Sequence, residues 1–189
     1  MDVLHKLSKL RGATVRASDG EVGTVQDLYF DNAEWRVKYL AVKTDALGAD
    51  MVLVTPSAIR SPWNSAEVPV AMTREEINRS TPDVLPEDRR LISSRELNGC
   101  HILASDGEIG HVDDVLVDED SWRIRYLVLD TSNWIGGRSV VVSPRVLTGV
   151  DLSERIVKVD ADREDIRNSP VLDSIEVGPA EDAPPFAII

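Results

Sequence analysis

Carboxylates are the residues of this 189-residue chain whose spacing most suggests chemistry. Asp27 and Asp31 reappear at the same interval as Asp114 and Asp118, and Asp120 follows shortly after. Hard cations bind several oxygen ligands, so a divalent-metal site is one hypothesis. The alternative is that these aspartates form turns and end strands, as repeated turns would require. Because the acidic run at Asp118 and Asp120 lacks the glycine and distal glutamate of a calcium loop, we expect turns and keep a weak divalent-ion site as an alternative.

Histidine and cysteine could also bind a metal or act as nucleophiles. Cys100, His101 and His111 stand where the similar N-terminal stretch has alanine and threonines. Zinc sites need well-spaced His and Cys ligands, and neither Cys-x-x-Cys nor His-Glu-x-x-His occurs. We therefore expect no metal site, keep His111 with Asp118 and Asp120 as weak candidates, and interpret Cys100 as a small buried residue. Gly-x-Ser-x-Gly is absent as well, so a serine hydrolase has no support. With no catalytic pattern among these residues, we expect no enzyme and no cofactor.

Charge and composition exclude several classes of protein. The chain has 33 acidic and 21 basic residues, a net charge of −12, which opposes the electrostatic attraction that dominates nucleic-acid binding. A single cysteine excludes an intrachain disulfide and favours a reducing compartment, so we predict a cytoplasmic protein. No apolar run is long enough for a membrane span, and the first residues do not have the pattern of a signal peptide.

An internal repeat positions all of these residues. Residues 10–23 reappear as residues 97–110, and the correspondence continues through Trp35 and Trp122, an offset of 87. Chance does not explain so long a match, so the chain is two copies of one unit. The predicted boundaries are a first domain at 8–80, a linker at 81–96, a second domain at 97–170, and a flexible acidic, proline-rich tail at 171–189.

Each copy is predicted to be mainly β. Asp-Gly pairs at 19–20 and 106–107 suit tight hairpin turns. Alternation along residues 35–42 predicts a strand with its aromatic side chains on one face. Capping-box spacing at 73–76, and more weakly at 162–165, predicts one short helix at the end of each copy. Several short strands followed by one helix suggest a small closed barrel.

Four apolar residues are candidates for contacts between domains or with a partner. Trp63 and Trp134 do not correspond between the copies and fall in predicted loops, so we expect them to be exposed. Leu40 and Leu127 end a half-apolar outer strand face in each copy. That face leads us to expect the two barrels to dock with pseudo-twofold symmetry.

The repeated pattern resembles a known family. Leu-x-Gly-x-x-Val/Ile-x-Ala-Ser-Asp-Gly-Glu-Val/Ile-Gly-x-Val, followed by Trp-x-Val/Ile-x-Tyr-Leu, is similar to the PRC-barrel family, which includes the cytoplasmic domain of the photosynthetic reaction-centre H subunit. The resemblance implies two tandem, strongly bent PRC-type barrels, each followed by a short helix. It also implies an adaptor or assembly surface and carries no general catalytic motif.

These observations predict a non-enzymatic binding or scaffolding module that mediates protein–protein assembly. Its protein partner is unknown, and a homo-oligomer or association with a membrane complex fits the resemblance equally. One alternative is an H-subunit-like accessory protein of photosynthetic electron transfer. Another is a weak divalent-metal-binding or small enzymatic protein that uses Asp118, Asp120 and His111.

Overall fold

The computed structural model describes residues 3–44, 50–80, 90–132 and 137–172. The chain divides into two compact units. The N-terminal unit comprises His5–Arg95 and Glu119–Arg123, and the C-terminal unit comprises Met1–Leu4, Glu96–Asp118 and Ile124–Ile189. In chain order the elements are β1 (Leu4–Lys6), α1 (Leu7–Leu10), β2 (Thr14–Ala17), β3 (Gly20–Asp31), β4 (Arg36–Lys43), β5 (Met51–Val54), the 3-10 turn η1 (Pro56–Ala58), β6 (Glu67–Pro69), α2 (Arg74–Ser80), β7 (Leu91–Ser93), α3 (Ser94–Leu97), β8 (His101–Ala104), β9 (Gly107–Asp118), β10 (Ile124–Asp130), β11 (Ser139–Val142), the 3-10 turn η2 (Pro144–Val146), β12 (Leu147–Asp151), β13 (Ile156–Val159) and α4 (Arg163–Arg167).

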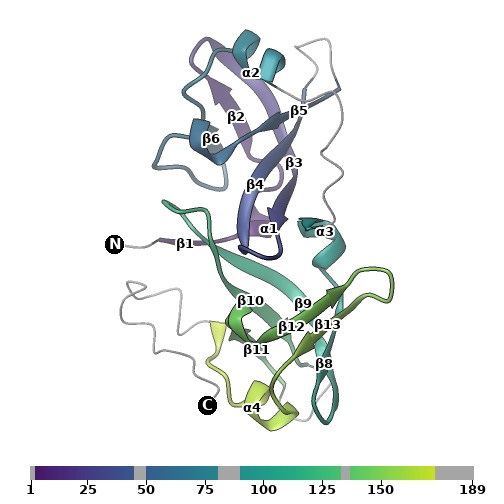
Figure 1. The fold of residues 1–189 in the computed structure, drawn as a ribbon. Helices are drawn as coiled ribbons and strands as arrows, with labels where there is room; N and C mark the ends of the chain where they lie inside the picture. Colours follow the sequence, from purple (N-terminus) through teal and green to yellow (C-terminus); the bar gives the residue numbers. More distant parts are fainter. Residues whose placement is uncertain (1–2, 45–49, 81–89, 133–136, 173–189) are drawn as a thin grey trace. The chain divides into compact units, whose positions relative to one another are not determined.

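The N-terminal unit contains one sheet with the order β5-β4-β3-β2-β6 (Figure 1). The long strand β3 pairs with β2 near its start and with β7 near its end. The pairing of β2 with β6 is parallel, whereas the other pairings are antiparallel. Pro69 lies in β6 at the end of the sheet, where a strand can lack one backbone donor.

The C-terminal unit repeats this arrangement. Its strand order is β11-β10-β9-β8-β13-β12, and β1, whose first residue Leu4 belongs to the same unit, pairs with β9. The pairing of β8 with β13 is again parallel. Leu116, Val128, Val141 and Leu172 form a buried apolar cluster between these elements. The two similar sheets confirm a mainly β fold built from two copies of one unit.

Both predicted hairpin turns and both predicted helix starts are present. Gly20 and Gly107 have φ values of 143° and 137°, which the Asp-Gly turns require. In each copy the aspartate of that turn accepts a hydrogen bond from the first backbone N–H of the helix that ends the copy, α2 in the first copy and α4 in the second. The distances are 2.9 Å from Arg74 N to Asp19 Oδ1 and 2.9 Å from Arg163 N to Asp106 Oδ1. The first hairpin of each copy is thereby bonded to its last helix.

The structure departs from the sequence-based expectations in three places. Among the described strands neither sheet closes into a barrel, since each strand order has two ends. Residues 91–96 of the expected linker lie in β7 and in α3, which ends at Leu97, because β7 finds backbone partners on β3. Val171, expected in the tail, bridges to Val140, and Leu172 is buried. Residues 81–89 and 173–189 lie outside the described residues.

The expected alternation along residues 35–42 is interrupted. Tyr29 pairs with Tyr39 but Phe30 pairs with Val37, so one residue of β4 bulges out of the ladder. Trp35 lies before the strand with a φ of 50°, and its ring stacks on Phe30 at a centroid distance of 5.5 Å. It is therefore a turn residue and does not share the strand face on which alternation places it.

Candidate functional site

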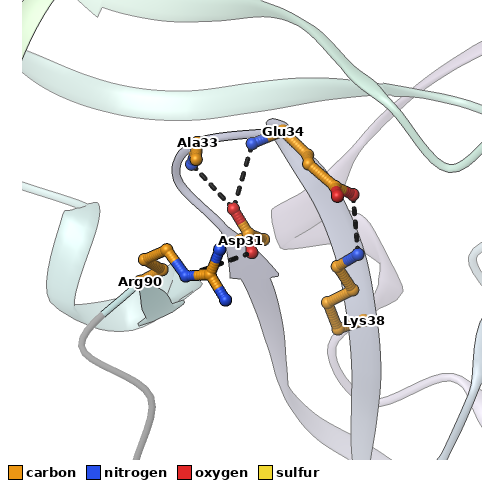
Figure 2. Close-up of polar contacts among 5 residues, drawn as sticks. All are labelled: Asp31, Ala33, Glu34, Lys38 and Arg90. Atoms are coloured by element: carbon orange, nitrogen blue, oxygen red, sulfur yellow. Dashed lines mark hydrogen bonds and ion pairs between the residues drawn. The ribbon is translucent and has the colours of Figure 1, made fainter.

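The repeated aspartates hold turns and strand ends. Asp31 ends β3, and its Oδ1 accepts hydrogen bonds from the backbone N–H groups of Ala33 and Glu34, at 2.7 and 3.0 Å (Figure 2). Its Oδ2 lies 4.0 Å from Nε of Arg90. Lys38 donates to Glu34 at 2.7 Å across the same turn, and this bond lowers the pKa of the Glu34 carboxyl. Asp31 thus shapes the β3–β4 connection, in agreement with the turn interpretation.

Asp27 is a buried carboxylate in the middle of β3. Its Oδ2 accepts a hydrogen bond from Ser93 Oγ at 2.5 Å, and its Oδ1 accepts from Ser94 Oγ at 2.7 Å and from the Leu28 N–H at 2.8 Å. Arg11 Nη2 in turn donates to Ser94 Oγ at 3.1 Å. A buried carboxylate supplied with several donors stabilises the elements that provide them. Asp27 therefore fastens β7 and the start of α3 to β3.

The weak metal candidates do not form a metal-binding group. Asp118 is 2% exposed and its Oδ2 lies 3.7 Å from Arg125 Nη2, whereas Asp120 is exposed. His111 lies seven residues from Asp118 along β9. Over residues 3–44, 50–80, 90–132 and 137–172, no three or more His, Cys, Asp or Glu side chains are arranged to hold a metal ion. Cys100 is buried, as expected, and burial raises the pKa of its thiol.

Trp63 is buried, at 2% exposure, which corrects the expectation of an exposed contact residue. Within the N-terminal unit its ring stacks on Trp122 at a centroid distance of 4.6 Å and lies 4.1 Å from the His5 ring. Trp63 Nε1 also donates to the backbone oxygen of Glu119 at 3.3 Å. A loop tryptophan becomes buried here because three aromatic rings cover one another.

The Glu119 side chain completes this aromatic cluster. Its carboxylate accepts hydrogen bonds from Ser61 Oγ and from His5 Nε2, the latter at 3.1 Å. Burial opposes ionisation of Glu119, but the hydrogen bonds from Ser61 and His5 outweigh it and lower the pKa of the carboxyl. Glu119 lies between the serine and the histidine, so the histidine cannot act as a base on the serine as in a hydrolase triad. The cluster is therefore a packing arrangement.

The other candidate contact residues are either buried or outside the described residues. Leu40 lies between Leu28 and Val54 in its sheet, and Leu127 lies between Val115 and Val142. Both leucines are fully buried, so neither lies on a surface that an added partner can reach. Docking of the two barrels through them stays a prediction. Trp134 lies outside the described residues.

One edge strand distinguishes the C-terminal unit. β12 stands at the end of the strand order, and β13 is its one neighbour among the described strands. None of its five residues is buried. At the equivalent place the N-terminal unit has a bridge between Ile59 and Val70 and no strand, because the following residues include Pro62.

The backbone of β12 presents hydrogen-bonding groups to the open edge. Directly before β13, the Arg155 oxygen accepts from His101 N of β8 at 2.8 Å, and directly after β13, Asp160 N donates to the oxygen of Val146, the residue before β12, at 2.8 Å. Successive residues of a strand point their backbone N–H and C=O groups to opposite sides, so the N–H and C=O of Val157, two residues after Arg155, also point toward β8. Val150 is the register partner of Val157, so its N–H and C=O point away from β13, toward the open edge. Sequence reasoning did not identify this edge, because a strand order cannot be read from periodicity.

Comparison with known protein families accords with this duplicated architecture. A family model described as the PRC-barrel domain matches residues 2–70 and again residues 90–166. No curated protein matches the chain. Within the part of the chain that the structure describes, no helix has the length and apolar character needed to cross a membrane.

Proposed function

The chain belongs to the PRC-barrel domain family in two successive regions, and from this we propose that it is a binding module that mediates protein–protein assembly. We propose further that β12 is the edge to which an extended segment of a partner protein adds as a further strand. The observation that carries the proposal is the Val150 backbone pointing outward from an exposed edge strand. Backbone hydrogen bonds to an open sheet edge are a common way for proteins to bind extended peptides.

The contrast between the copies supports this choice of edge. Natural proteins protect edge strands because an open edge recruits other strands. The N-terminal unit ends its sheet with β6, which contains Pro69 and so lacks one donor. β12 contains no proline and carries Thr148 and Val150, residues that favour strands. Two similar scaffolds with different edges fit a module in which one copy binds.

A pair of substitutions at Val150 tests the proposal. Val150→Pro removes the outward N–H and leaves the pairing of β12 with β13 intact, whereas Val150→Thr keeps the N–H and serves as the matched control. Both variants and the unaltered protein are used as affinity baits in extracts of the native host, after circular dichroism has shown equal folding. A protein captured by the unaltered chain and by Val150→Thr, but lost with Val150→Pro, supports the proposal. Equal capture by both variants contradicts the role of this edge, and capture of no protein at all contradicts the binding function.

A further inference from the structure

Two histidines and an aspartate form a row across three neighbouring strands of the C-terminal unit. His101 on β8 is the register partner of His111 on β9, and His111 is the register partner of Asp130 on β10. Residues directly opposite on antiparallel strands project to the same face of the sheet. The His101 N–H donates to the oxygen of Arg155, the residue before β13, so its backbone is not bonded to His111. The two histidines therefore form a non-hydrogen-bonded antiparallel pair, the closer of the two kinds, with Cα atoms about 4.5 Å apart.

Each imidazole has a carboxylate near one of its nitrogens, hydrogen-bonded in the case of His101 and at ion-pair distance in the case of His111. His101 Nδ1 lies 2.6 Å from Glu108 Oε1, and His111 Nε2 lies 3.8 Å from Asp130 Oδ2. Both rings reach solvent, with 55% of the His101 side chain and 35% of the His111 side chain exposed. Among the described residues, the other nitrogen of each ring, Nε2 of His101 and Nδ1 of His111, has no partner and is left for another ligand.

The N-terminal unit has the same row without the histidines. Thr14 is the register partner of Thr24, and Thr24 is the register partner of Lys43. These three residues occupy the positions of His101, His111 and Asp130. The fold therefore needs no imidazole at either position, since threonine serves there in the other copy. Where the N-terminal unit has the positively charged Lys43, the C-terminal unit has the negatively charged Asp130, and a negative charge beside the histidines favours binding of a cation.

We propose that His101 and His111 form a two-histidine site for a divalent transition-metal ion such as Zn²⁺, Ni²⁺ or Cu²⁺. Imidazole is a preferred ligand for these ions. Glu108 is hydrogen-bonded to Nδ1 of His101, and Asp130 lies beside Nε2 of His111. Carboxylates at the ring nitrogen that does not bind the metal orient metal-binding histidines in many sites. Water completes the coordination, so the site needs no third protein ligand, consistent with the absence of a larger metal-binding group among the described residues.

Nuclear magnetic resonance of the imidazole nitrogens tests the site in the full-length, tag-free chain. The chain contains three histidines, and His5 in the aromatic cluster is the internal control. Added Zn²⁺ should shift the signals of His101 and His111 together, with saturation at one ion per chain, and leave His5 unchanged. The proposal is overturned if neither signal moves in molar excess of Zn²⁺, or if all three histidines respond alike.

Substitutions copied from the other repeat separate the site from the fold. His101→Thr and His111→Thr should each weaken Zn²⁺ binding by more than about tenfold, because a single imidazole remains, and Glu108→Gln should weaken it by about tenfold. The metal-free unfolding midpoint should stay near that of the unaltered protein. The reverse change, Thr14→His with Thr24→His and Lys43→Asp, should raise the stoichiometry from one Zn²⁺ to two. Unchanged affinity in the threonine variants, or a stoichiometry that stays at one in the reverse variant, would show that this row does not bind the metal.

Discussion

Substitution of Gly110 tests how closely β9 approaches β10, because the structure leaves no room for a methyl group at this position. A Cβ added to Gly110 would lie 2.0 Å from the Asp130 carbonyl oxygen, and its φ is +77°. Real Cβ atoms essentially never come closer than 3.0 Å to another heavy atom, so Gly110→Ala forces a shift of at least about 1.0 Å between β9 and β10. The positive φ costs about 1–2 kcal/mol. Loss of one or two backbone hydrogen bonds adds about 1–3 kcal/mol, so we expect Gly110→Ala to lower the free energy of unfolding by about 2–5 kcal/mol.

Two other glycines of the same unit separate backbone strain from the steric clash. Gly99 has a φ of +76°, but a Cβ there would meet only the flexible end of Arg155, so Gly99→Ala should cost about 1–2 kcal/mol. Gly149 has nothing within 4 Å, and Gly149→Ala should stay within about 0.5 kcal/mol of the unaltered protein. Urea unfolding followed by circular dichroism measures all three, and an equal m-value makes them comparable. If Gly110→Ala costs no more than Gly99→Ala, the Asp130 carbonyl is not where the structure has it.

Three further substitutions test the polar contacts. Asp27→Asn should cost about 2 kcal/mol in urea unfolding, because three donors lose a charged acceptor; a loss below about 0.5 kcal/mol would contradict its role. The folded-state pKa of Glu119 is lowered, so its ionised form contributes stability above the unfolded-state pKa of about 4.3, and this contribution is lost as the pH falls through the folded-state value. The difference in melting temperature between the unaltered protein and Glu119→Gln should therefore shrink as the pH drops below about 4, and a constant difference would refute the reasoning. Thr73→Ala should cost about 1 kcal/mol and speed amide exchange at Glu76, whereas Thr73→Ser, which keeps the capping hydroxyl, should do neither.

Local signals in the sequence predicted much of the fold. The Asp-Gly turns and the capping box at Thr73 depend on neighbouring residues, and both are present. The capping box at Asp162 is present as well, with Asp165 N donating to Asp162 Oδ1 at 2.8 Å. The repeat predicted two similar units because identical turns must recur where identical residues recur. These features needed no knowledge of distant contacts.

Features that depend on distant partners were not predicted. Residues 91–93 are weakly patterned by themselves and become a strand because Tyr29, Phe30 and Asp31 offer backbone partners. The burial of Trp63 depends on Trp122, which lies 59 residues later. Tertiary contacts override local pattern in both cases.

The candidate metal site was predicted only in part. The absence of histidines from the first copy marked His101 and His111 as unusual. Their alignment with Asp130 follows from the β9–β10 register, which contains shifts that no periodicity shows. The weak candidates Asp118 and Asp120 were selected by sequence proximity, and proximity does not bring three ligands to one point on an extended strand.

The parallel pairing of the first and last strands in each copy has a consequence during synthesis. Residues 14–16 of β2 pair with residues 67–69 of β6, and residues 101–103 of β8 pair with residues 156–158 of β13. At about 5–20 residues per second, the ribosome needs about 3–10 s to make the later strand after the earlier one. During that interval one edge of β2 or β8 has no partner, and an open edge is where nascent chains associate wrongly. The duplicated chain passes through this vulnerable interval twice, so its folding yield in the cell should depend on translation speed and on chaperones that shield the first hairpin of each copy.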